Sequence, residues 1–192
     1  MLRAHGYDVV DLESAGVEER AEEDSLETAT TFAENALLKA RYFFQRTGVP
    51  TLADDSGLCC DALDGAPGVQ SKRWSGRPDL TGQALDDANN ALLLERLAGA
   101  ARAGRTSRAA RYVCAAAYVD GAREVTAEGA AQGRMLELPT GNGGFGYDPY
   151  FWSDELQASF GVVSREAKGA VSHRGRAIRA LLDVLKKLEQ GS

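Results

Sequence analysis

The feature that most constrains this chain is a short apolar run that ends abruptly in charged residues. Residues Val49 to Ala53 are apolar and partly β-branched, which predicts a short buried strand. Asp54 and Asp55 follow at once, and then come Ser56 and Gly57. Acidic side chains are rarely buried unless they are paired or hold a metal, so two of them at the mouth of a strand predict a site for a divalent cation. An Asp-rich turn without a further role fits the same four residues equally well.

The two carboxylates can share one ion only if the backbone changes direction. In an extended strand, successive side chains point to opposite faces, so Asp54 and Asp55 would diverge. We therefore expect the strand to end at Ala53 and the chain to turn there. Ser56 and Gly57 permit such a turn, and glycine also lets another backbone or a ligand come close.

Length and composition predict one globular domain, residues 1–192, organised in two lobes. A chain of 192 residues with 44% apolar and 26% charged residues matches an ordinary globular protein. No apolar run approaches the roughly 20 residues that span a bilayer, and the N-terminus has no signal-peptide core. We predict a cytoplasmic protein without membrane contact. Cys59, Cys60 and Cys114 have no metal-ligand spacing and are expected to be buried small apolar residues.

The distribution of charge bears on the class of partner. The formal net charge is −6, which argues against a general nucleic-acid binder. Residues 161–192 nevertheless hold seven Lys and Arg against three acidic residues. This basic end fits a small anion such as a nucleotide phosphate, and it equally fits a solvated helix face, so charge alone does not decide.

Residues 28–47 are predicted to form a helix, because apolar side chains recur there every three or four residues. Gly48 suits its end and Pro50 cannot continue it. Thr31 and Glu34 match the capping-box pattern of a helix start. Glu34 therefore has two interpretations, as a partner of the cap and as a metal carboxylate near the helix start.

Two further helices are predicted at residues 81–103 and 174–189 from their apolar spacing. Residues 108–119 contain tyrosine and valine and predict a strand, and residues 123–131 are predicted to return as its partner. Asp120-Gly121 between them is a strong signal for a two-residue hairpin turn. The antiparallel pair means that the sheet is not purely parallel.

Residues 140–149 form a glycine-rich stretch, Thr-Gly-Asn-Gly-Gly-Phe-Gly-Tyr-Asp-Pro. Its glycines let the backbone approach a ligand closely, and Phe145 and Tyr147 can stack on a planar ring. The stretch is neither a P-loop nor the dinucleotide fingerprint, because the flanking residues of those motifs are missing. A flexible loop anchored by two aromatic side chains explains the pattern equally well.

Lys168 and the run Ser172-His173-Arg174-Gly175 precede the last predicted helix. Ser172 suits the N-cap position. His173 and Arg174 are electrostatically awkward at a helix start, which favours negative charge, and an anionic ligand would relieve the conflict. A capped surface helix is the alternative.

Taken together, these stretches resemble one family, the non-canonical purine nucleoside triphosphate pyrophosphatases, also called inosine/xanthosine triphosphate pyrophosphatases. The resemblance covers about Tyr7 to Leu188. Several motifs in one order are far more specific than any single motif. The matching stretches are Thr31 to Ala40, Ala53 to Leu58, Gly65 to Val69, Gly143 to Pro149 and Ser172 to Gly175.

The resemblance implies an α/β fold with a long twisted mixed β-sheet, flanking helices and two lobes around a central cleft, assembled as a homodimer. It implies Mg²⁺-dependent hydrolysis of ITP, dITP and XTP to the monophosphate and pyrophosphate, which removes deaminated purines from the nucleotide pool. The expected partner is a small nucleoside triphosphate, with no nucleic acid and no membrane.

The resemblance also implies roles for individual residues. Asp55 is similar to the catalytic carboxylate, and Glu34, Asp54 and Asp55 to the acidic groups around Mg²⁺. His173 and Arg174 look like the residues that contact the 6-oxo group of the purine. The substrate-binding set implied by the resemblance is Ser56, Phe145, Gly146, Tyr147, Asp148, Lys168, His173 and Arg174.

One departure from the family's pattern leaves an alternative open. Family members begin with a strand and a Ser/Thr-x-Asn-x-x-Lys phosphate loop, and this sequence contains no such loop. We therefore expect a domain that is N-terminally truncated relative to the family. The alternative function is a nucleotide-binding module with weak or no catalysis.

Overall fold

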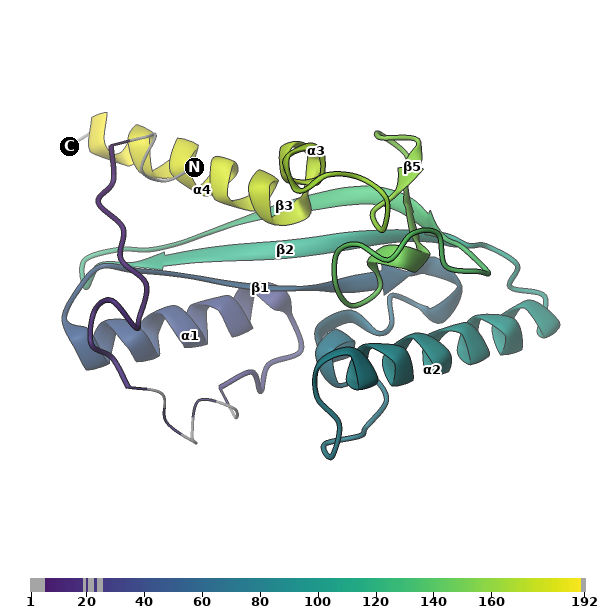
Figure 1. Cartoon of the computed structure of the whole chain (residues 1–192). Coiled ribbons are helices and arrows are strands. Elements are labelled where there is room, and N and C mark those ends of the chain that lie inside the picture. The colour runs from purple at the N-terminus through teal and green to yellow at the C-terminus, as the bar shows by residue number, and fades with distance from the viewer. Residues whose placement is uncertain (1–5, 19, 21–22, 24–25, 191–192) are drawn as a thin grey trace.

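The computed structural model describes residues 6–18, 20, 23 and 26–190. It contains one five-stranded sheet in the order β1-β2-β3-β4-β5, flanked by helices on both faces (Figure 1). Helices α1 and α2 lie on one side of the sheet, towards opposite ends, and α3 and α4 lie on the other side. The elements that position the site are α1 (Phe32–Thr47), β1 (Thr51–Cys60), α2 (Gly82–Arg102), β2 (Ala109–Val119), β3 (Glu124–Met135), β4 (Phe151–Ser153), β5 (Ala158–Ser159), α3 (Arg165–Val171) and α4 (His173–Gln190).

The predicted helices and the hairpin are confirmed, with ends that follow local chemistry. The Thr31 side chain accepts a hydrogen bond from the backbone N–H of Glu34 (3.2 Å) and caps α1, while Gly48 ends it in the left-handed region at φ 68°. Strands β2 and β3 pair in antiparallel register about the turn at Asp120-Gly121, from Val119 opposite Glu124 onward. Short 3₁₀ turns at Asp61–Leu63, Gly68–Arg73 and Asp148–Tyr150 complete the loops.

The long strands β1 to β3 connect two packed halves of the molecule. In one half, a cluster of small alanines lies between the sheet and α1, and a second cluster lies between the sheet and α4. In the other half, a larger apolar cluster joins α2 to the sheet and to the segment around β4 and β5. The α/β class with a long sheet and flanking helices is thus confirmed. The three cysteines are free and buried, as expected.

The sheet differs from a mixed one, because every pairing among the described strands is antiparallel. Short connections, residues 120–123 and 154–157, join β2 to β3 and β4 to β5, as is usual for antiparallel neighbours, while the longer segment 136–150 returns the chain from β3 to β4.

Strand β1 does not end where the sequence predicted. It continues through both aspartates to Cys60, because each of its residues from Thr51 onward is paired with β2. Asp54 and Asp55 lie opposite Ala116 and Ala115, whose small side chains leave room for them. The expected turn is therefore absent from this described stretch, and the two carboxylates point to opposite faces of the sheet.

Candidate active site

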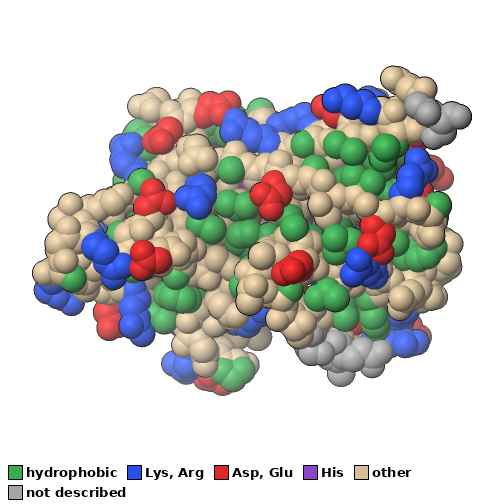
Figure 2. Space-filling view, turned by 180° about the vertical axis from the view of Figure 1, so that it is seen from behind, with side chains coloured by type: hydrophobic (Ala, Val, Ile, Leu, Met, Phe, Trp, Pro, Cys, Tyr) green, Lys and Arg blue, Asp and Glu red, His purple; other side chains and the backbone are tan. Residues whose placement is uncertain are grey.

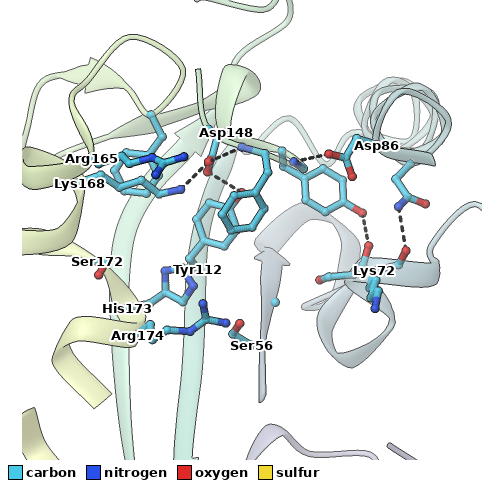
Figure 3. A pocket seen from close by; sticks show the side chains of 18 of the residues that line it. Ser56, Lys72, Asp86, Tyr112, Asp148, Arg165, Lys168, Ser172, His173 and Arg174 are labelled. Carbon is cyan, nitrogen blue, oxygen red and sulfur yellow. Dashed lines mark hydrogen bonds and ion pairs between the residues drawn. The ribbon is translucent and has the colours of Figure 1, made fainter. Parts of the chain in front are cut away.

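A cavity of about 680 Å³ opens between the α2 side of the molecule and the start of α3 and α4 (Figure 3). It brings together residues that are far apart in the sequence and that come from β1, the glycine-rich loop, α3 and α4. The whole predicted substrate-binding set lines this cavity: Ser56, Phe145, Gly146, Tyr147, Asp148, Lys168, His173 and Arg174.

Asp148 anchors the glycine-rich loop and a lysine at one wall of the cavity. It is 1% exposed, and its carboxylate accepts hydrogen bonds from the Phe145 N–H (2.9 Å) and from the Tyr112 hydroxyl (3.3 Å). The same carboxylate forms an ion pair with the Lys168 ammonium. Gly144 has a φ of +78°, and a Cβ there would collide with this carboxylate. Asp148 thus acts on the site through the groups it positions.

Helix α2 and the 3₁₀ turn at Gly68–Arg73 fix the other side of the loop. The Gly146 N–H donates to Asp86 (2.7 Å), and the Gly146 carbonyl accepts from Asn90 (2.9 Å). The Tyr147 hydroxyl donates to the Ser71 carbonyl (2.8 Å), and the Tyr147 side chain is buried. Tyr147 is therefore an anchor of the loop, as one of the two interpretations of this stretch required.

Phe145 is the aromatic side chain that the loop presents to a ligand. It is 72% exposed, and the Lys168 ammonium lies 4.6 Å from the centre of its ring. The same ammonium lies 5.2 Å from the centre of the Phe160 ring. A planar base placed against Phe145 would therefore also be next to a fixed positive charge.

His173 is held as a neutral ring at the start of α4. It stacks on Tyr112 with ring centres 4.8 Å apart and planes 11° apart. Burial, together with the positive charges of Arg174 and Lys168, lowers the pKa of His173 to about 4, although the charge of Asp54 acts in the opposite direction. Its buried Nδ1 has no hydrogen-bond partner among the described residues. A neutral imidazole with a free ring nitrogen suits an uncharged polar ligand group.

Ser172 caps this helix start as predicted, because its hydroxyl accepts a hydrogen bond from the Gly175 N–H (3.1 Å). Arg174 next to it donates through Nε to the Asp54 carboxylate (2.9 Å). The Cys114 thiol also lies against Asp54, at 3.5 Å. Asp54 thus positions an arginine of the cavity on the α4 face of the sheet.

Asp55 lies on the opposite face, against α1. It is 7% exposed and accepts hydrogen bonds from Asn35 Nδ2 and from the backbone N–H of Ser56, each at 3.0 Å. The Lys39 ammonium is 3.6 Å away. Burial raises the pKa of the Asp55 carboxyl, while Asn35 and Lys39 oppose that rise. Asp55 does not line the cavity itself, but its neighbours Ser56 and Gly57 do.

Glu27 is the carboxylate that shares the surroundings of Asp55. Its side chain pairs with Lys39 at 2.7 Å and with Arg73 at 3.2 Å, and its negative charge contributes to raising the pKa of Asp55. Burial acts to raise the pKa of Glu27 itself, but the hydrogen bonds and charges of Lys39 and Arg73 outweigh it, so the net pKa is lowered. No local sequence pattern marked Glu27.

The three predicted metal carboxylates are not brought together. Glu34 accepts a hydrogen bond from the Thr31 hydroxyl (2.9 Å) at the start of α1, and Asp54 faces α4. Among residues 6–18, 20, 23 and 26–190, no group of three His, Cys, Asp or Glu side chains is placed to hold a metal ion.

Several further cavity residues had no signal in the sequence. Two of them, Lys72 and Arg165, are basic. The Lys72 carbonyl accepts from Asn89 Nδ2 (3.0 Å), which holds the lysine at the cavity wall. The remaining lining residues that sequence reasoning did not single out include Ser71, Leu85, Asp86, Asn89, Tyr112, Phe160 and Val163.

The chain is similar in sequence and in fold to known proteins. A family model described as the Ham1 family matches residues 1–184. A dITP/XTP pyrophosphatase of Frankia alni is 48% identical, over 86% of this chain and 81% of that protein. One from Nitratidesulfovibrio vulgaris is 47% identical, over 95% of this chain and 86% of that protein. Among solved structures, a HAM1 protein from Coxiella burnetii superposes with a TM-score of 0.75 at 37% identity, covering 84% of this chain and 79% of that one. A nucleoside-triphosphatase, also titled dITP/XTP pyrophosphatase, from Mycobacterium abscessus gives 0.70 at 40% identity, over 96% and 90%.

Proposed function

The chain belongs to the Ham1 family, and on that premise we propose that it is a hydrolase of non-canonical purine nucleoside triphosphates. It cleaves ITP, dITP and XTP to the monophosphate and pyrophosphate. The observation that carries this proposal is that all residues predicted to bind substrate line one cavity of about 680 Å³. Relatives matched over more than four fifths of this chain are dITP/XTP pyrophosphatases, so a nucleotide-binding module without catalysis is not favoured.

The two ends of the cavity are lined by different kinds of side chain, and this difference determines the substrate orientation that we propose. Ser56 and Gly57 lie at the β1 end, next to Asp55, and Lys72 approaches from the α2 side (Figure 3). We assign the phosphates to this end. Phe145 and Lys168 lie at the α3 end, where an exposed ring and a fixed ammonium receive the base.

A divalent metal, which we take to be Mg²⁺, would be held by carboxylates on the α1 face of β1 together with the substrate phosphates. Mg²⁺ is usually held by one or two carboxylates together with substrate phosphates. Asp55 and Glu27 supply two carboxylates that already share one cation, the Lys39 ammonium. We therefore assign the metal to Asp55 and Glu27, and not to Asp54 or Glu34. Such an ion supplies a bound water of lowered pKa and neutralises phosphate charge.

Asp55 is the proposed catalytic carboxylate, orienting or deprotonating the attacking water. Asn35 and the Ser56 N–H fix its two oxygens, so the carboxylate cannot rotate freely. An Asp has an ordinary pKa near 4, and the raised pKa of Asp55 makes it a stronger base than an exposed one.

The base is selected by polar groups that adenine would leave unpaired. His173 is neutral, and Arg174 is held beside it by Asp54. We assign the 6-oxo group of hypoxanthine or xanthine to this pair. An amino group at that position would meet the Arg174 donors without an acceptor, and such mismatches permit discrimination on the order of 10⁴.

The enzyme further acts, in this proposal, as a cytoplasmic homodimer without nucleic-acid or membrane partners. No helix in the described part of the chain is long and apolar enough to cross a membrane. On the face shown in Figure 2, acidic and basic side chains are intermingled among the described residues, which is unlike a nucleic-acid surface. Light scattering should give twice the chain mass of 20.5 kDa.

Product analysis tests the proposed activity. The purified chain is incubated with Mg²⁺ and dITP, XTP, dATP or dGTP, and the products are separated by anion exchange. We expect monophosphate and pyrophosphate from dITP and XTP, and little turnover of dATP. Absence of both products from every substrate would exclude the function.

A further inference from the structure

Four long cationic side chains line the cavity, and they differ in whether the protein neutralises them. Lys168 is paired with Asp148, and Arg174 is paired with Asp54. Within the described residues, neither the Lys72 ammonium nor the Arg165 guanidinium forms a hydrogen bond or an ion pair, although both line the cavity. The carboxylate of the adjacent Glu166 interacts with Arg165 through its charge alone. A charged group that faces a binding site without a protein partner is available to a ligand.

The position of Arg165 associates it with the base end of the cavity. It is the first residue of α3, one turn before Lys168, so both side chains lie on the same side of the helix. The Ser164 hydroxyl accepts a hydrogen bond from the Ala167 N–H (3.2 Å) and fixes this helix start. In Figure 3, Arg165 lies beside Lys168 next to the Asp148 loop, and Ser56 lies at the other end.

The two acidic side chains that line the cavity are hydrogen-bonded to groups other than Arg165. The Asp148 carboxylate already receives the Phe145 N–H, the Tyr112 hydroxyl and the Lys168 ammonium. Asp86, the other acidic side chain that lines the cavity, receives the Gly146 N–H on the α2 side. A guanidinium has five N–H donors and no acceptor, so Arg165 can recognise only acceptor groups of the ligand.

We propose that Arg165 is a specificity-determining residue that donates to the carbonyl oxygen at position 2 of the purine, and so favours xanthine over hypoxanthine nucleotides. This rests on the proposed function, because it assumes a purine at the α3 end of the cavity. Both bases carry a 6-oxo group, but xanthine alone has a second carbonyl at position 2. Guanine carries an amino group there, which presents a donor to Arg165 and leaves both groups unsatisfied.

The test compares XTP with ITP in matched variants. Arg165→Leu removes the donors, Arg165→Lys keeps the charge without the planar fork, and Arg96→Leu removes an exposed arginine on α2 outside the cavity. We expect Arg165→Leu to lower kcat/KM for XTP about tenfold, the loss expected for one charge-assisted hydrogen bond, with ITP changed less than about twofold. Arg165→Lys should fall between, and Arg96→Leu should match wild type for both substrates.

An unchanged ratio of XTP to ITP turnover in Arg165→Leu would overturn the proposal, as would an equal fall for both substrates. Calorimetric binding of XMP and IMP separates this inference from the proposed activity. If the wild type binds both monophosphates but hydrolyses neither triphosphate, the function fails while a tenfold loss of XMP affinity in Arg165→Leu still supports Arg165. Equal XMP affinity in the two proteins contradicts it. Thermal melts of both variants check that the fold is intact.

Discussion

Asp54 and Asp55 are neighbours in β1 with opposite surroundings. The Asp54 side chain is 23% exposed, faces α4 and forms an ion pair with Arg174. The Asp55 residue is 7% exposed, faces α1 and has a pKa raised by burial. The alternation of a strand places one carboxylate to position a binding residue and the other for chemistry. Position on the strand, more than residue type, thus separates the roles we assign to them.

The largest difference between the two faces should appear in catalysis. Asp55→Asn keeps the shape of the side chain and one oxygen, but it removes the negative charge. We expect kcat for dITP to fall by about 10²- to 10⁴-fold, the range associated with loss of a general base. Steady-state kinetics measure this, and a thermal melt within a few degrees of wild type shows that the variant is folded. A kcat within threefold of wild type would remove Asp55 from the mechanism.

The α4 face should show a distinctive dependence of stability on pH. His173 has a pKa near 4 in the folded chain and an ordinary value of 6.5, so the unfolded state binds more protons between these two values. Its contribution to stability is therefore present above pH 6.5 and is lost as pH falls toward 4, by on the order of 3 kcal/mol at most.

Urea unfolding at several pH values checks this prediction. We expect the free energy of unfolding of wild type to decline more steeply between pH 6.5 and 4.5 than that of His173→Asn. Parallel pH curves for the two proteins would show that His173 is not held neutral by its surroundings.

Removal of the Asp54 charge should have a smaller effect, confined to substrate binding. Asp54→Asn leaves Arg174 without its ionic partner, so the guanidinium is positioned less firmly. We expect KM for dITP to rise by up to about tenfold, as for one charge-assisted hydrogen bond, with kcat within threefold. The pair is partly exposed, so the melting temperature should change little. A fall in kcat as large as that expected for Asp55→Asn would show that Asp54 also acts in catalysis, which contradicts the separate roles assigned to the two aspartates.

Local patterns were sufficient for the parts of the fold that depend on neighbours in sequence. Thr31 and Gly48 mark the two ends of α1, because helix capping depends on residues a few positions apart. Asp120-Gly121 forms the turn of the β2–β3 hairpin, which also depends on neighbouring residues. The substrate-binding set was found through a family resemblance, whose motifs the fold then gathers around one cavity.

The features that the sequence did not predict depend on long-range partners. Strand β1 continues past Ala53 because β2 offers paired alanines, which local composition does not reveal. Glu27 joins Asp55 through Lys39, and it lies in an acidic stretch without periodicity. Arg165 is available to a ligand because Asp148 is paired with Lys168, a contact that the local sequence does not reveal.

The most direct test is a crystal structure of Asp55→Asn soaked with XTP and Mg²⁺. The account predicts the purine against Phe145 and Lys168, the phosphates beside Ser56 and Lys72, and the metal between the phosphates and Glu27. A nucleotide bound with its base at the Ser56 end, or bound outside this cavity altogether, would contradict it.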